Sequence, residues 1–132
     1  MGTPVYPVIF SRIDIPASQT GYALRLAGDL PSLFILPRPC RLIGLTAYCD
    51  PPRSAGTLTM RVRLNGQDTA LQAAIDAANP SKVVVQWPKG AQVSAEAGDE
   101  LGVVVDTTAD WAPAGTPDLS VSVWIGGGET FG

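Results

Sequence analysis

The side chains of this sequence that could carry acid–base catalysis are carboxylates, because its 132 residues contain no histidine. Without histidine, the usual general base and the Ser-His and Cys-His nucleophile pairs are absent, as are most zinc sites. Paired carboxylates remain as an option, and the candidates are Asp99 with Glu100, Asp106 with Asp110, and Glu96. Asp99 and Glu100 fall in a turn before an expected strand, where solvated acids are common. We therefore predict that the protein is not an enzyme.

Asp106, Asp110 and Asp118 could supply the oxygen ligands that calcium prefers. Their spacing resembles no known calcium loop, and loops of β-sandwiches are often acidic for solubility. The two cysteines, Cys40 and Cys49, do not form a CxxC motif. If residues 41–48 form one strand, the thiols lie about 30 Å apart by strand rise, which is too far for a disulfide. We expect no cofactor, no bound metal and two free, mostly buried thiols.

Three tryptophans, Trp87, Trp111 and Trp124, suggest a different kind of site. Exposed aromatic rings on a sheet face stack against sugars in many carbohydrate-binding modules. Trp124 lies on the polar side of an expected strand, and Trp111 lies in an expected loop. Alternatively, the rings cover the end of the fold or fill a subunit interface, where tryptophan is enriched. Trp111 and Trp124 are therefore candidate interaction residues.

The elements that must position these side chains are β-strands. In residues 56–66, apolar side chains at every second position from Leu58 to Leu64 alternate with threonine and arginine, so the two kinds project to opposite faces. Asn65-Gly66 then supplies the residues that tolerate the positive φ of a tight hairpin. The pattern predicts an antiparallel sheet with one buried face.

Similar patterns recur along the chain. Residues 40–48 predict a long strand with Ile43 on the same face as Leu45 and opposite Leu42. The only helix-like stretch is residues 71–78, where apolar residues recur at three- and four-residue spacings before a proline. The other expected strands are residues 22–26, 33–36, 67–71, 82–87, 92–93, 101–105 and 119–125.

Fourteen glycines and twelve prolines indicate many turns, and there is no strand–helix–strand rhythm. About eight short strands with long connections favour an all-β fold, a jelly-roll β-sandwich of antiparallel strands, over a meander. We predict a single domain. Residues 22–126 form the jelly roll, residues 1–21 an extended N-terminal arm, and residues 127–132 a flexible glycine-rich tail.

The predicted arm is too apolar for a free tail. Two interpretations stay open: it forms the first strand of the domain's own sheet, or it packs on a neighbouring subunit. The candidate contact residues are Val5, Tyr6, Val8, Ile9 and Phe10.

The net charge of −3 and the pI of about 4.7 argue against nucleic-acid binding, which favours clustered Lys and Arg. Arg61 and Arg63 share a strand face, which we interpret as a solvated or inter-subunit face rather than a phosphate site. No apolar run approaches the ~20 residues of a membrane span. The N-terminus also lacks the features of a signal peptide, so we expect a protein made in the cytoplasm.

Five motifs are informative together: RLIGLTAY, a Pro-rich loop, GTLTMRVRLNG, AEAGDELGVVV and a closing LSVSVWI. With them, residues 40–125 resemble the jelly-roll modules of tailed-phage virion accessory proteins, namely capsid decoration (cement) proteins and fibre or spike heads. The resemblance implies a structural protein on the virion capsid surface that assembles as a homo-oligomer, a trimer or a dimer, and binds the major capsid protein. Deleting residues 1–12 should then abolish capsid binding and leave the β fold intact. The alternative is a receptor- or glycan-binding head of a phage fibre.

Overall fold

Strands make up nearly all of the regular structure in this protein. The computed structural model describes residues 5–26 and 33–127, and the one helix within them is a 3₁₀ turn, η1 (Lys89–Ala91). The strands are β1 (Val5–Arg12), β2 (Tyr22–Ala23), β3 (Arg25–Leu26), β4 (Phe34–Ile35), β5 (Cys40–Asp50), β6 (Leu58–Leu64), β7 (Gln67–Ile75), β8 (Lys82–Gln86), β9 (Val93–Ala95), β10 (Glu100–Thr107) and β11 (Asp118–Gly127).

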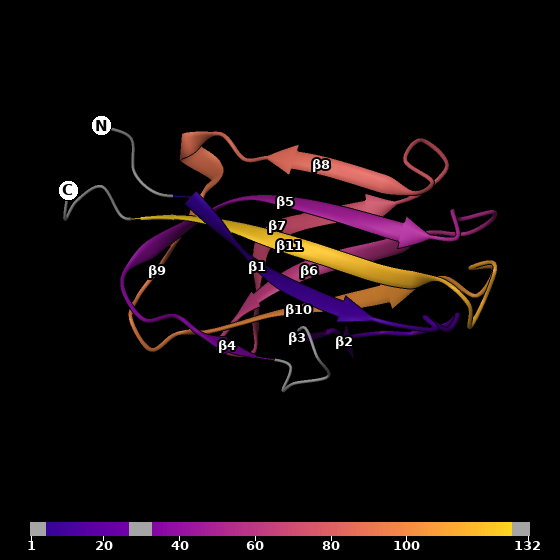
Figure 1. The fold of residues 1–132 in the computed structure, drawn as a ribbon, viewed down its shortest axis with the longest axis horizontal. Helices are drawn as coiled ribbons and strands as arrows, with labels where there is room; N and C mark the ends of the chain where they lie inside the picture. The colour runs from indigo at the N-terminus through magenta and orange to yellow at the C-terminus, as the bar shows by residue number, and fades with distance from the viewer. Residues whose placement is uncertain (1–4, 27–32, 128–132) are drawn as a thin grey trace.

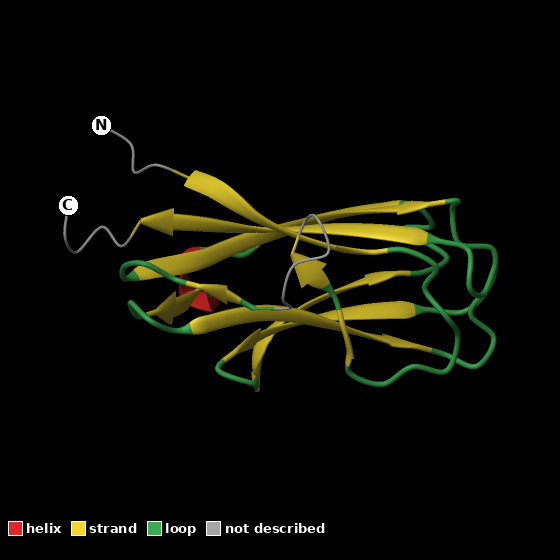
Figure 2. Cartoon of the chain, turned by 60° about the horizontal axis from the view of Figure 1, so that its bottom comes forward, coloured by secondary structure: helices red, strands yellow, loops and turns green. Residues whose placement is uncertain are grey.

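The strands form two sheets that lie as two layers, one over the other (Figures 1 and 2). The β11 sheet has the order β3-β1-β11-β5-β8, and β9 also pairs with β5. The β10 sheet has the order β2-β10-β6-β7, and β4 also pairs with β10. Side chains from the inner faces of both sheets form one core, in which Phe10, Leu45, Val62, Leu101 and Val123 are almost completely buried.

The strand pairs are nested along the chain. β6 pairs with β7, β5 with β8 and β9, β2 and β4 with β10, and β1 with β11, all antiparallel. A long hairpin folded over into two layers gives this order, which is the arrangement of a jelly roll. The predicted all-β antiparallel sandwich is therefore confirmed.

The hairpin predicted at residues 56–66 is present. Leu58, Met60 and Val62 are completely buried. Asn65 and Gly66 both have positive φ values, 56° and 78°, and connect Leu64 directly to its partner Gln67. Two consecutive left-handed residues define the turn that matches the twist of a two-residue hairpin.

The helix predicted at residues 71–78 is wrong, because residues 67–75 form β7. Leu71, Ala73 and Ile75 lie two residues apart, so they also fit the period of a strand, and Leu71 and Ile75 are buried. Pairing with β6 satisfies the backbone hydrogen bonds of the segment, and this tertiary contact overrides the helical preference of its alanines.

The predicted facing of β5 is also wrong at one point. Trp124 pairs with Gly44 and Ile125 with Leu42, so Ile43 is an extra residue in a β-bulge. The bulge reverses the alternation, and Leu42 and Leu45 are both buried in the core while Ile43 is not. Gly44 is required there because a Cβ would lie 2.7 Å from the Val85 carbonyl oxygen.

Residues 5–12 form a strand of the domain's own sheet, which is the first of the two interpretations of the N-terminal segment. β1 pairs with β11 along its whole length, and Val8 and Phe10 are buried in the core. Deleting residues 1–12 would therefore remove a strand and two core side chains, so the structure leads us to expect that this deletion destabilises the fold. Residues 1–4 and 128–132, which include most of the predicted tail, lie outside the described residues.

Cys40 and Cys49 are free and buried, as predicted. They lie near opposite ends of the long strand β5, which keeps the two thiols apart. Burial, with a smaller contribution from the neighbouring Asp50, raises the pKa of the Cys49 thiol to about 11. Because the thiolate is the reactive form, Cys49 is a packing residue in the folded protein.

The loop after β10 closes one end of the sandwich with Trp111, which is 2% exposed. The Ala112 backbone N–H donates to the Ala55 carbonyl oxygen at 3.0 Å, so this loop lies directly against the loop before β6. Gly56 has a φ of +77°, and a Cβ there would lie 2.6 Å from the Trp111 backbone nitrogen. The close contact of the two loops depends on this glycine.

Gly56→Ala is expected to lower the free energy of unfolding by at least about 2 kcal/mol, from backbone strain and steric overlap together. Gly98→Ala is the matched control, because Gly98 also has positive φ (+90°) but a Cβ would meet no described atom within 4 Å. We expect the control to lose only about 1 kcal/mol. Urea unfolding measures both, and equal losses would contradict the tight loop contact.

Candidate interaction surface

One side of the β11 sheet faces away from the core, and the central part of this side carries little charge. Side chains alternate across a strand, so every second residue of β1, β11, β5 and β8 points to this side, which faces the viewer in Figure 1. Strand pairing arranges these residues in three rows of four, which we call the neutral face. The rows are Pro7, Trp124, Gly44 and Gln86; Ile9, Ser122, Thr46 and Val84; and Ser11, Ser120, Tyr48 and Lys82.

Large apolar side chains protrude from the neutral face. Val84 is 76% exposed, Tyr48 54% and Ile9 44%. Trp124 is partly buried, and its indole Nε1–H donates to Thr46 Oγ1 at 2.9 Å, which holds the ring across the neighbouring strand. Exposed apolar groups gathered on one side of a soluble domain are characteristic of interaction surfaces.

Two shallow, open hollows lie beside Tyr48. One, of about 270 Å³, is lined by Thr46, Val84, Ser120 and Ser122 together with Tyr48. The other, of about 260 Å³, also includes Tyr48 and Ser120 and extends toward the start of β11. Small serine side chains thus leave space next to the large side chains. The neutral face therefore has both protruding side chains and hollows.

The outer side of the β10 sheet is different, because charged groups on it are paired. Arg61 forms ion pairs with Asp68 and, at 2.9 Å, with Asp106, and Arg63 Nε lies 2.6 Å from Asp68. The Gly21 backbone N–H also donates to Asp106 at 2.8 Å. The arginines are neutralised by neighbouring carboxylates, which agrees with the interpretation of a solvated face and not with a phosphate site.

These contacts lower the pKa values of the Asp106 and Asp68 carboxyl groups. For Asp106, burial acts upward, but the hydrogen bonds from Gly21 and Arg61 hold its pKa below the ordinary value. For Asp68, the hydrogen bond from Arg63 is the largest cause of a lowered pKa, with Arg61 adding to it. Both groups therefore stabilise the fold in their ionised form.

Three other acidic candidates, Asp110, Asp118 and Asp99, accept hydrogen bonds within the protein, whereas Glu96 and Glu100 are exposed. Asp110 accepts a hydrogen bond from the Thr108 hydroxyl at 2.6 Å, and Asp118 accepts one from the Asp14 backbone N–H at 3.2 Å. Asp99 accepts bonds from the Glu96 backbone N–H and the Asn65 amide, which together lower its pKa and shape the turn. Across residues 5–26 and 33–127, no three His, Cys, Asp or Glu side chains gather as a metal site would require.

The structure separates the predicted interaction residues into two groups. Val5 (50% exposed), Tyr6 (40%) and Ile9 are accessible, whereas Val8, Phe10 and Trp111 are buried and cannot contact a partner. Trp111 as a sugar-stacking ring is therefore wrong, and it covers the end of the sandwich instead.

Of the predicted set, Ile9 and Trp124 are brought together. Trp124 pairs with Pro7, which is two residues before Ile9, so the two side chains lie in neighbouring rows of the neutral face. Tyr48 and Val84 were not among the predicted residues. Val84 lies in a run of three valines, in which no alternation marks the exposed member.

Within the described residues, no helix has the length and apolar character to cross a membrane.

Asp106→Asn is expected to lower the free energy of unfolding at pH 7 by roughly 1 kcal/mol, as for a partly exposed ion pair. Because the pKa of Asp106 is lowered by folding, its contribution is complete above about pH 4 and is lost as the pH falls through the folded-state value. Wild type should therefore lose more stability between pH 7 and pH 3 than Asp106→Asn.

Urea unfolding at several pH values checks this expectation. Asp110→Asn is the control, since its described partner is a hydroxyl group and not an arginine. An identical pH dependence in wild type and Asp106→Asn would show that the ion pair has no part in acid stability.

Comparison with known proteins adds information about the fold. No family model matches the sequence, and no curated protein matches it. A chain of the cyanophage Pam1 capsid asymmetric unit aligns with a TM-score of 0.60 and 16% identity, over 96% of this chain and 87% of that one. A chain of the acid-stable capsid of Helicobacter pylori bacteriophage KHP30 aligns with a TM-score of 0.56 and 12% identity, over 96% and 90% of the two chains. The protein is thus similar in fold, over nearly its whole length, to chains of two bacteriophage capsids.

Proposed function

We propose that this protein is a structural component of a bacteriophage virion, which binds the outer capsid surface as a homo-oligomer and stabilises it. The major capsid protein is its partner. The observation that carries the proposal is the fold likeness to chains of two phage capsids over 96% of this chain. The motifs at residues 40–125 point to the same class of protein, with decoration as the specific role.

The surface supports binding rather than turnover. The neutral face exposes Val84, Tyr48 and Ile9, which gain free energy when a partner covers them. The carboxylates considered for catalysis at Asp106 and Asp110 instead hold an arginine and a hydroxyl group. A protein whose reactive groups serve its own loops is suited to a structural role.

A second accessible apolar region lies where β1 begins. Val5 and Tyr6 are both exposed and adjacent, and Tyr6 pairs with Ile125 near the end of β11. We assign the capsid contact to this end. This assignment retains Val5 and Tyr6 as contact residues from the predicted arm, and it is compatible with β1 as a strand of the domain's own sheet. The receptor- or glycan-binding alternative loses support, because one of its two candidate rings, Trp111, is buried.

The test uses capsids of the encoding phage prepared from a strain in which this gene is deleted. The purified chain should co-sediment with these capsids to saturation and raise the temperature at which they disrupt. Tyr6→Asp should weaken binding at least tenfold, because it places a charge in an apolar contact. Ala70→Lys, which changes an exposed position on β7, should bind like wild type.

Failure of the wild-type chain to co-sediment would overturn the decoration role. Binding of the chain to host-cell glycans or receptors, in the absence of capsid binding, would instead establish the fibre-head alternative.

A further inference from the structure

We propose that the neutral face is the surface through which copies of this chain contact one another. This inference deepens the proposed function and rests on its homo-oligomer. It assigns the contact between copies to the outer side of β1, β11, β5 and β8, and separates it from the capsid contact at Val5 and Tyr6.

The distribution of charge favours a second copy as the occupant. The chain has a net charge of −3, so copies repel one another on average. The three rows of the neutral face contain one charged residue, Lys82, which lies at a corner. Arg25 and Arg41 lie outside the rows and are each engaged in an interaction. Two copies that meet through this face therefore bring no like charges together at its centre.

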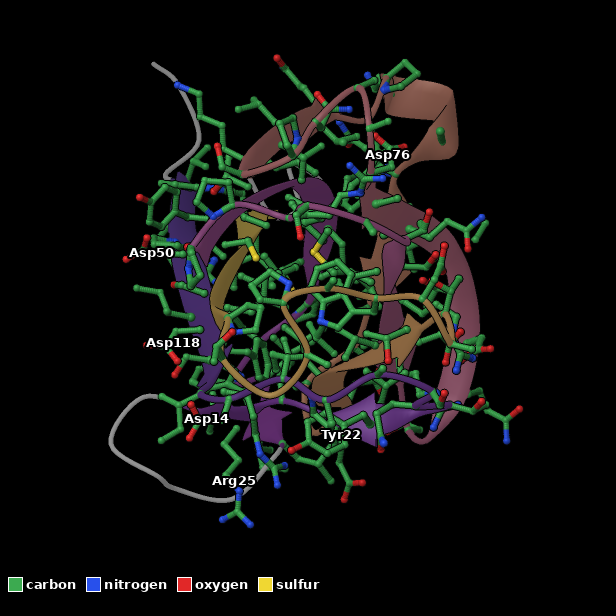
Figure 3. All side chains as sticks on the ribbon, turned by 90° about the vertical axis from the view of Figure 1, so that its right-hand side faces the viewer. Asp14, Tyr22, Arg25, Asp50, Asp76 and Asp118 are labelled. Carbon is green, nitrogen blue, oxygen red and sulfur yellow. The ribbon has the colours of Figure 1, made fainter. Side chains whose placement is uncertain are left out.

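Acidic residues limit the neutral face at one end. Asp118 pairs with Asp50, and Asp14 donates its backbone N–H to Asp118, so three acidic residues follow one another beyond the third row. Figure 3 shows Asp50, Asp118 and Asp14 one after another along the β1 side of the molecule. They direct self-association to the rows nearer Trp124.

The shape of the face also suits a copy of itself. A contact between identical surfaces needs projections and hollows on the same patch. Tyr48 and Val84 protrude, and the hollow of about 270 Å³ over Ser120 and Ser122 lies beside them. The side chains of one copy can thus fill the hollow of another, as a dense interface requires.

The neutral face is large enough to form the centre of an interface. Four strands about 4.8 Å apart, over the five residues that the three rows span, give a flat footprint of roughly 300 Å². Stable interfaces bury about 800 Å² per partner, so side chains around the three rows complete the contact.

The test measures the mass of the full chain by sedimentation equilibrium and native mass spectrometry. Wild type should form a closed dimer, because a contact between identical faces is two-fold symmetric. Val84→Lys and Ile9→Lys place a charge at opposite edges of the face, and each should weaken association at least tenfold. Ala70→Lys, on an exposed position of the other sheet, is the matched control and should associate like wild type. Circular dichroism checks that every variant keeps its strands.

A wild-type chain that is monomeric at 100 µM (roughly a hundred times the Kd of a micromolar contact) would overturn the inference, as would unchanged association of both face variants. These results are distinguishable from failure of the proposed function. A monomer that binds capsids overturns only the self-contact. An oligomer that binds no capsid supports the self-contact and overturns the decoration role. Loss of capsid binding in Val84→Lys without a change of mass assigns the face to the capsid and overturns the inference.

Discussion

The antiparallel pairing of β1 with β11 is the contact on which the rest of the molecule depends. It joins an early strand to the last one, from Val5 with Gly126 to Arg12 with Leu119, and so closes the nested hairpin into a sandwich. The same register inserts Val8 and Phe10 into the core and sets Pro7 beside Trp124 on the outer side. Core closure and the geometry of the neutral face are therefore two results of one strand pair.

The two outer sides of the sandwich show how charge can be distributed without a change of fold. On the β10 sheet, Arg61, Arg63, Asp68 and Asp106 lie on neighbouring strands and neutralise one another. On the β11 sheet, serine, threonine and apolar residues take most of the outward positions of the three central rows, and the charged residues Lys82, Asp50, Asp118 and Arg41 lie at the margins. Water can solvate the first side well, whereas the second exposes area that a protein partner would cover. The two outer sides of the sandwich therefore differ in polarity.

Local patterns in the sequence predicted the parts of the fold that depend on neighbours in the chain. Strict alternation and Asn65-Gly66 were enough for the first long hairpin. The segment at Leu71 to Ile75 was ambiguous, because its apolar residues fit both a helix and a strand, and pairing with β6 decided the outcome. The bulge at Ile43 and the burial of Trp111 depend on partners about eighty and fifty residues away, at Ile125 and Ala55. Such long-range contacts leave no periodic signal, so the exposed surface was the least predictable part.

The register of β1 and β11 has a practical consequence. Val5 lies opposite Gly126, so the start of β1 and the end of β11 lie at the same pole of the sandwich, with the Trp111 loop at the other. Cargo that must leave Val5 and Tyr6 accessible therefore belongs at the opposite pole. An insertion between β7 and β8 would be carried there, whereas the loop between β10 and β11 is committed to covering the core with Trp111.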